Sequence, residues 1–281
     1  MPIIGRLVEL YRAEGIEIAT GLAPGRFAGM EAANFTWFFR NGESVTNGLG
    51  IALQEVYFLE HLFAAYRPRR LFVIGNALGW SALALAALLP ESRIVAIDAG
   101  FDRNSIEGLD LTNRIAAAAG FNLRAVQGVS PGDVGAIVDG ELGGPVEFAF
   151  IDGLHTNAQI ALDHAAVAAK AAGDAVYLFH DVAGFGLSLG LAAIERRAQI
   201  KAQHLDATPS GMALLFDPAQ HPEIAAAIAG FAPSPQAVAA LTEAGWEHRH
   251  RHLARWRRSL RKRVGRLRRR GTAYPWTTKA T

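Results

Sequence analysis

The chain has 281 residues, 51% of them hydrophobic and 19% charged, a composition that supports a globular protein with a sizeable core and excludes a disordered one. It contains no cysteine, which excludes disulfides, thiolate metal sites and cysteine nucleophiles. The net charge of +2 conceals an asymmetry, because residues 1–246 carry 15 basic and 25 acidic side chains whereas residues 248–270 carry 11 Arg and 1 Lys without an acid. This division predicts an appended basic arm with a partner of its own, or one that folds back on the acidic body.

The N-terminal region mixes charged and apolar residues and lacks an apolar block followed by a small-residue cleavage site. We therefore expect no secretory signal and a cytoplasmic protein. Residues 1–50 have no clear period and predict an irregular or helical cover. Residues 51–66 carry apolar side chains at helical spacing and precede Pro68, which predicts a helix leading into the fold.

From residue 71 onward, short apolar segments alternate with segments of helical period. The stretch 71–89 is apolar enough to resemble a membrane span, but Gly75 and Asn76 divide it into a strand and a buried helix. The expected strands are 71–74, 94–98, 123–127, 146–151 and 175–179. The expected helices are 78–89, 105–119, 131–138, 158–172 and 187–201. This alternation predicts a parallel sheet covered by helices on both faces.

The end of the alternation differs, because residues 202–205 and 212–216 predict two strands joined by turn residues at 208–211. Strands joined so closely pair antiparallel. The expected fold class is therefore α/β, with a doubly wound, mainly parallel sheet, an antiparallel last strand, a helical N-terminal cover and a basic C-terminal helix. The expected regions are a cover and lead-in helix at 1–66, the central domain at 67–218 and a helical extension at 219–281.

Polar residues and glycines gather where the expected strands end, the edge at which doubly wound sheets bind ligands. Gly75 permits a tight turn after the first strand, and Gly79 permits a ligand to approach the backbone. The turn is not a nicotinamide fingerprint, because Ala77 and Trp80 interrupt that template. Asp98 ends the second strand, where a carboxylate can accept both hydroxyls of a ribose.

Four further polar residues follow the fourth and fifth strands: Asp152, His155, His180 and Asp181. We expect them to converge on one site. Asp163 and His164, on the next expected helix, are expected to face solvent or to take part in capping.

Four segments together resemble class I S-adenosylmethionine-dependent methyltransferases with a Rossmann-like fold. They are Val-Ile-Gly-Asn-Ala-Leu-Gly-Trp-Ser (73–81), Ala-Ile-Asp (96–98), Phe-Ile-Asp-Gly-Leu-His (150–155) and Phe-His-Asp-Val (179–182). The resemblance covers about residues 51–216 and is greatest to the small-molecule O-methyltransferase branch with D-G-x-H and H-D motifs. The sequence differs from these relatives at Val73, where an acid is common, and at Ala77, where a third glycine is common.

The resemblance implies a binding site for S-adenosylmethionine. In it, the turn after the first strand lines the methionine part, Asp98 holds the ribose, and the residues after the third strand lie near adenine. The implied cofactor-binding residues are Gly75, Asn76, Gly79, Ser81, Asp98, Gly128, Ser130 and Asp152.

The resemblance also implies a divalent cation, Mg²⁺ or Mn²⁺, held by Asp152, His180 and Asp181. Here His180 replaces an acid and Val182 stands where Asn is frequent. Methyl transfer to oxygen needs a deprotonated acceptor hydroxyl, and either a metal or a histidine base can provide it. The candidate catalytic residues are His155, His180 and Asp181.

Two other functions compete with a small-molecule or glycan O-methyltransferase. Nucleic-acid methylation guided by the basic arm is one, although the chain has neither an Asp/Asn-Pro-Pro-aromatic motif nor a cysteine nucleophile. A noncatalytic cofactor-binding protein is the other. Turnover of a hydroxylated acceptor separates it from an enzyme.

The basic arm has a regular apolar stripe among its Arg residues. Its members are Leu253, Trp256, Leu260, Val264 and Leu267, and Gly271 follows. This spacing predicts a basic amphipathic helix. Three partners fit it: an anionic membrane surface, which would place the protein peripherally at the inner face of a membrane; the acidic body or a second subunit; and nucleic acid.

Overall fold

The structure, a computed structural model, describes residues 2–23, 25–27, 32–46, 50–101 and 103–250. The chain divides into two compact units, Met1–Ala232 and Pro233–Thr281. In the second unit, helix α9 (Pro235–Arg249) begins at Ser234, whose hydroxyl accepts a hydrogen bond from the Ala237 amide at 3.2 Å. The predicted amphipathic helix of the basic arm lies almost entirely outside the described residues.

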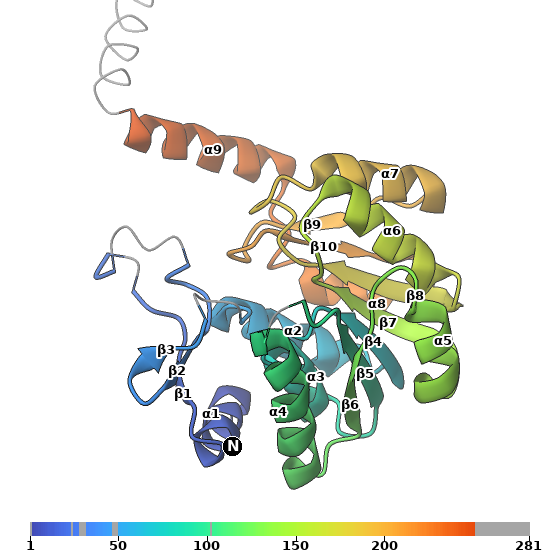
Figure 1. The fold of residues 1–281 in the computed structure, drawn as a ribbon. Coiled ribbons are helices and arrows are strands. Elements are labelled where there is room, and N and C mark those ends of the chain that lie inside the picture. Colours follow the sequence, from blue (N-terminus) through green and yellow to red (C-terminus); the bar gives the residue numbers. More distant parts are fainter. Residues whose placement is uncertain (1, 24, 28–31, 47–49, 102, 251–281) are drawn as a thin grey trace, which may run out of the picture. The chain divides into compact units, whose positions relative to one another are not determined.

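In its described part, the first unit is built on a seven-stranded sheet (Figure 1). The strands are β4 (Arg70–Ile74), β5 (Arg93–Asp98), β6 (Leu123–Gln127), β7 (Val146–Ile151), β8 (Ala171–Phe179), β9 (Gln203–Leu205) and β10 (Met212–Leu215). Their order is β6-β5-β4-β7-β8-β10-β9, and β10 is antiparallel to both of its neighbours. The predicted parallel sheet with an antiparallel end is confirmed.

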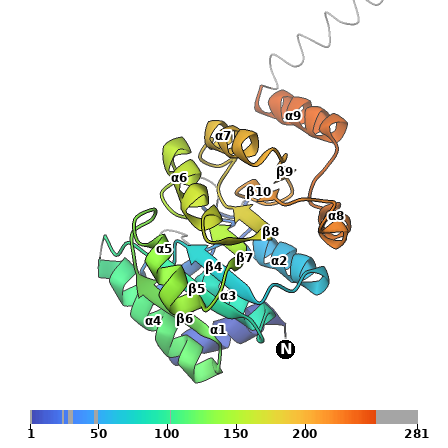
Figure 2. The same cartoon turned by 90° about the vertical axis from the view of Figure 1, so that its right-hand side faces the viewer.

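Helices cover both faces of this sheet (Figure 2). Successive side chains of β4 enter opposite cores: Leu71 and Val73 pack in the core formed with α1 to α4, and Phe72 and Ile74 in the core formed with α5 to α7. The helices are α1 (Ile3–Ala13), α2 (Leu53–Ala65), α3 (Trp80–Leu88), α4 (Arg103–Ala119), α5 (Val134–Ile137), a π-helical turn (Val138–Leu142), α6 (Asn157–Ala168), α7 (Ser188–Ala198) and α8 (Pro222–Ile228). Among the described residues, no helix is both long and apolar enough to cross a membrane.

The N-terminal cover consists of α1 and a small antiparallel sheet that the sequence did not predict. Its strands are β1 (Glu17–Ala19), β2 (Trp37–Arg40) and β3 (Glu43–Ser44). The cover is tied to the first turn of the large sheet, because the Tyr11 hydroxyl donates a hydrogen bond to the Leu78 carbonyl at 2.7 Å. The rings of Tyr11 and Phe38 also pack on Trp80.

The boundary between α6 and β8 differs from the prediction. The alanine-rich sequence favours helix to residue 172, but α6 ends at Ala168 and β8 begins at Ala171. Ala171 pairs with Val146 of β7 beside a register shift. Pairing to an already buried strand therefore overrides the helix propensity of alanine here.

Candidate functional site

The strand order reverses at β4, so the carboxyl ends of β4, β5, β7 and β8 lie side by side at one edge. Gly75 makes the turn after β4 with φ +97°, and a Cβ there would lie 1.8 Å from the Asp152 carbonyl oxygen. No other residue fits so close to a neighbouring backbone. Gly75 therefore lets the turns after β4 and β7 touch.

Gly79, the second glycine of the turn after β4, has a different role from Gly75. Its φ is +84°, and a Cβ would lie 2.0 Å from Oγ1 of Thr112 on α4. Gly79 precedes α3 and does not line the cavity described below. Its observed role is to let α3 start closely against α4.

Asp98 holds the first turn in shape. One carboxylate oxygen accepts hydrogen bonds from the amides of Asn76 at 3.1 Å and Ala77 at 2.8 Å, and the other accepts from the Gly100 amide at 3.0 Å. Ala77, where the resemblance favours a third glycine, has a φ of +45°. The bond to Asp98 helps to hold a residue with a side chain in this left-handed conformation.

A cavity of about 410 Å³ lies over this edge, within the range of small-ligand sites. It is lined by the predicted residues Gly75, Asn76, Ser81, Asp98, Gly128, Ser130, Asp152 and His155. Neither His180 nor Asp181 is part of the lining, and both are buried behind it. The N-terminal cover contributes Phe38 and Gly50, which the sequence had not indicated.

Three polar side chains converge at the part of the cavity formed by the segment after β6 and by α6. Oδ1 of Asp163 accepts a short hydrogen bond from the Ser130 hydroxyl and another from the Gln159 amide at 2.7 Å. Burial raises the pKa of Asp163, although these two hydrogen bonds oppose the shift. The expectation that Asp163 and His164 face solvent is wrong, since both are buried.

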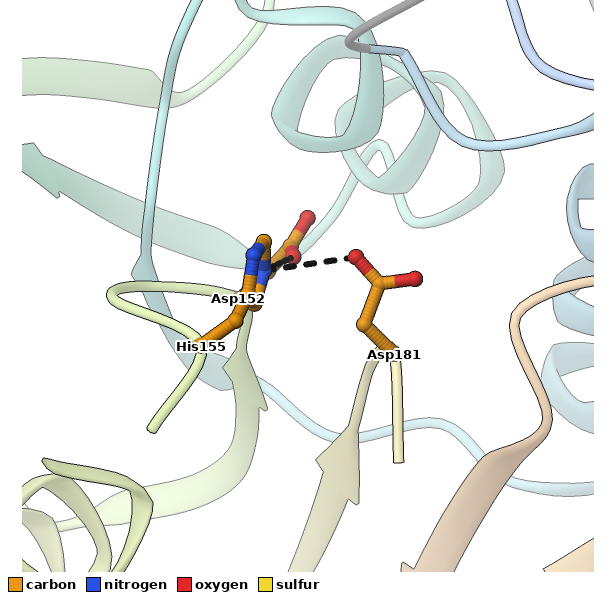
Figure 3. Close-up of side chains that lie close together, drawn as sticks. All are labelled: Asp152, His155 and Asp181. Atoms are coloured by element: carbon orange, nitrogen blue, oxygen red, sulfur yellow. Dashed lines mark hydrogen bonds and ion pairs between the residues drawn. The ribbon is translucent and has the colours of Figure 1, made fainter. Parts of the chain in front are cut away.

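Asp152, His155 and Asp181 form a close cluster beside the cavity (Figure 3). Nε2 of His155 is hydrogen-bonded to Oδ1 of Asp152 at 3.2 Å and lies 3.3 Å from Oδ2 of Asp181. Each of the three residues offers one ligand atom within 4.8 Å of the others, a spacing that could hold a metal ion. Asp181 has φ +57°, a conformation that Asp tolerates better than most residues.

His180 approaches the same two carboxylates from the buried side. Its Nδ1 lies 3.2 Å from Oδ1 of Asp152 and 3.3 Å from Oδ2 of Asp181. Neither contact has the geometry of a hydrogen bond, so this buried nitrogen has no hydrogen-bond partner among the described residues. The other ring nitrogen, Nε2, lies 3.0 Å from Oε2 of Glu55 on α2.

Opposing effects set the charges in this cluster. Burial alone would raise the pKa of Asp152, but the charge of His180 and the hydrogen bond with His155 hold it below its usual range. Burial would lower the pKa of His180, yet the carboxylates of Asp152 and Glu55 raise it well above the usual value. The pKa of His155 is raised by Asp152 and Asp181 against the same effect of burial.

Glu55 is the site residue that sequence reasoning missed. Burial alone would raise the pKa of Glu55. The charge of His180 and the hydrogen bonds from Ser210 and Ala52 lower the pKa by more than burial raises it, so the carboxylate favours its charged form. The available signal was an acid on the buried face of a helix, at its third residue. Sequence alone supplied no partner, because His180 is 125 residues away.

Comparison with known proteins finds similarity over the central part of the chain. A family model described as a methyltransferase domain matches residues 72–182. The O-methyltransferase from Bacillus cereus, solved with SAH, is 17% identical over 59% of this chain and 82% of its own, with a TM-score of 0.50. The O-methyltransferase of tomaymycin synthesis from Streptomyces achromogenes, solved with SAM, is 20% identical over 60% and 82%, with a TM-score of 0.48. No curated protein matches the chain in sequence.

Proposed function

We propose, from the match of residues 72–182 to a methyltransferase domain, that the chain transfers a methyl group from S-adenosylmethionine to a hydroxyl of a small molecule. One observation carries the proposal. The cavity extends from the glycine turn and Asp98 to Asp152 and His155, so cofactor and acceptor sites share one space.

The cofactor half of the cavity offers polar groups at separate places. Asp98 keeps about one of its four carboxylate acceptor positions beyond the three used by backbone amides, and this position can accept a ribose hydroxyl. Ser130, Gln159 and Asp163 offer donors and acceptors at the expected adenine position. Ser81 and Asn76 line the part next to the first turn, where the methionine moiety would lie.

The acceptor half of the cavity centres on His155. Its ring packs on Phe185 at 4.4 Å between centroids, and Phe185 is exposed, as is the nearby cavity residue Leu154. An apolar rim beside a histidine suits an acceptor with an apolar or aromatic body and a hydroxyl. His155 in its neutral form is the group that would take the hydroxyl proton as the oxygen attacks the methyl carbon.

The residues also fit a divalent cation. Asp152, His180 and Asp181 would hold it, since the buried Nδ1 of His180 faces both carboxylates and lacks a hydrogen-bond partner among the described residues. A mixed set of oxygen and nitrogen donors suits Mn²⁺ better than Mg²⁺. When bound, such a cation lowers the pKa of an acceptor hydroxyl and orients it.

The test uses the full chain, S-adenosylmethionine with a labelled methyl group, and a panel of phenols, sugars and oligonucleotides. We expect transfer to a hydroxylated small molecule, loss of transfer after exhaustive chelation, and recovery with Mn²⁺. His155→Ala should lower the rate by about 10²–10⁴-fold, the usual contribution of a general base. His204→Ala, at an exposed position, is the matched control.

Each other outcome has a definite meaning. Activity that survives chelation but fails in His155→Ala would reject the cation and retain the histidine base. Methylation of oligonucleotides alone would favour a nucleic-acid enzyme. Cofactor binding without transfer to any acceptor would favour a noncatalytic binding protein.

For the basic arm, we propose attachment to an anionic membrane surface, which would make the protein peripheral at the cytoplasmic face. The support is its sequence: 11 Arg and 1 Lys between residues 248 and 270, with apolar residues at helical spacing. Docking on the acidic body or on a second copy of the chain is the alternative, and a salt-resistant dimer would indicate it.

A further inference from the structure

We infer that Glu55 is a positioning residue for His180, fixing which ring nitrogen of that histidine faces Asp152 and Asp181. This inference rests on the proposed function, because the nitrogen so presented is one of the proposed cation ligands. Glu55 itself touches neither the cavity nor the two aspartates in any described contact.

The carboxylate of Glu55 is held from both ends. Oε2 accepts hydrogen bonds from the Ala52 amide at 2.8 Å and from Nε2 of His180 at 3.0 Å. Oε1 accepts from the Ser210 amide at 3.0 Å and, by a short bond, from the Ser210 hydroxyl. A carboxylate has about four acceptor positions, so all of them are used. Glu55 is completely buried and cannot turn away without losing several of these bonds.

This arrangement decides the orientation of the His180 ring. An ionised carboxylate only accepts hydrogen bonds, so the ring nitrogen facing it must carry the proton. Nε2 therefore donates a hydrogen bond to Glu55, and this bond holds the ring with Nδ1 toward Asp152 and Asp181, where a cation would displace the proton that the two carboxylates favour on Nδ1. The rings of Phe35 and Phe150 lie edge-on against His180 at 6.2 and 5.9 Å, which further limits ring rotation.

A carboxylate behind a histidine is a recurring feature of protein metal sites. Metal-binding histidines usually donate their other N–H to such a group, and its removal weakens metal binding by about 10–100-fold. Here the carboxylate belongs to Glu55 on α2, the helix that precedes the matched residues 72–182. Its Oε1 is anchored by Ser210 in the turn between β9 and β10.

Glu55 also stabilises the start of α2 through Ala52, so a purely structural role is the competing explanation. Two substitutions separate the roles. Glu55→Gln puts an amide nitrogen where an acceptor is needed and disturbs the His180 contact. Ser210→Ala removes a buried hydrogen bond to Oε1 but leaves the bond to His180. Both should lower thermal stability.

The experiment is calorimetric titration of the full-length chain with Mn²⁺ alone at one fixed pH. We expect Glu55→Gln to bind Mn²⁺ about 10–100-fold more weakly than wild type and Ser210→Ala to bind close to wild type. Wild-type affinity in folded Glu55→Gln, or equal losses in both variants, would overturn the inference.

A second measurement keeps the inference testable if Glu55→Gln fails to fold. In ¹⁵N NMR spectra of the wild-type chain, added Zn²⁺ should shift Nδ1 of His180 while Nε2 keeps its proton. The reverse assignment would overturn the role of Glu55. Absence of metal binding by the wild type would overturn both the cation and this inference, whereas methyl transfer by the chelated chain would leave the enzyme itself intact.

Discussion

At the scale of single residues, Asp98 combines two duties. Its carboxylate holds the turn after β4 through the amides of Asn76 and Ala77, and it lines the cavity where a ribose is proposed to bind. The sequence identified the position from its place at the end of a strand. The three hydrogen bonds that Asp98 accepts from backbone amides could not be predicted, because they depend on the path of a turn that includes the left-handed residue Ala77.

We expect Asp98→Ala to weaken binding of S-adenosylhomocysteine at least tenfold, about 1.4 kcal/mol, since it removes the proposed ribose acceptor and loosens the turn. Isothermal titration of the full chain measures this. Asp110→Ala, which removes an exposed acid on α4, is the control and should bind normally. Unchanged affinity in a folded Asp98→Ala protein would remove Asp98 from the cofactor site.

The cluster around His180 shows what sequence can and cannot supply at this scale. Asp152, His155, His180 and Asp181 were predicted to converge because parallel strands end at one edge, and the structure brings them within contact distance. Glu55 could not be found in this way. It reaches the cluster from a helix outside the alternation, through a contact that only tertiary packing creates.

At the scale of helices and strands, most of the central domain could be predicted from its periodicity. Strands β4 to β7 lie within a residue of their expected bounds, because each is a short apolar run between turn residues. The small sheet β1-β2-β3 could not, since its strands are two to four residues long and carry no clear alternation. The start of β8 was misplaced because alanine favours helix, and the pairing with β7 that overrides this preference is not visible in the sequence.

The packing of α6 on β8 predicts a pH-dependent stability. His164 lies against the rings of Tyr177 and Phe179, and burial, with a smaller effect of Arg197, lowers its pKa to about 4. A base with a lowered pKa in the folded state binds its proton more readily when unfolded. The contribution of neutral His164 to the free energy of unfolding is therefore complete above the unfolded pKa of about 6.5, and it is lost as the pH falls toward 4.

We expect the unfolding free energy of wild type to fall by about 3 kcal/mol more than that of His164→Leu between pH 6.5 and 4. Urea unfolding at a series of pH values measures the difference. His204→Leu changes an exposed histidine and should keep the wild-type slope. Parallel curves for wild type and His164→Leu would show that His164 is not the titrating group.

At the scale of the whole molecule, charge is the dominant asymmetry. The acidic body carries the proposed catalytic site, and the basic residues gather after residue 247. Each basic residue near an anionic bilayer contributes about 1 kcal/mol, so several together can hold a protein at the surface.

We expect the full chain to co-sediment with vesicles of anionic lipid and not with neutral ones, and high salt to reduce the bound fraction. A chain ending at His250 should stay in the supernatant. The triple change Leu260→Ser, Val264→Ser and Leu267→Ser keeps every charge and should bind more weakly, because it removes apolar insertion. Equal pelleting of full-length and shortened chains would end the membrane proposal.

The anchoring of Glu55 has a consequence for synthesis on the ribosome. Ser210 is translated 155 residues after Glu55, and at about 5–20 residues per second this delay lasts roughly ten to thirty seconds. A carboxylate buried without its hydrogen-bond donors is strongly disfavoured, so α2 cannot settle into its final place on the nascent chain during that interval. The turn between β9 and β10 therefore completes the hydrogen bonds of Glu55, and a chain released before Ser210 would contain β4 to β8 but lack both β10 and the anchor that holds Glu55 against His180.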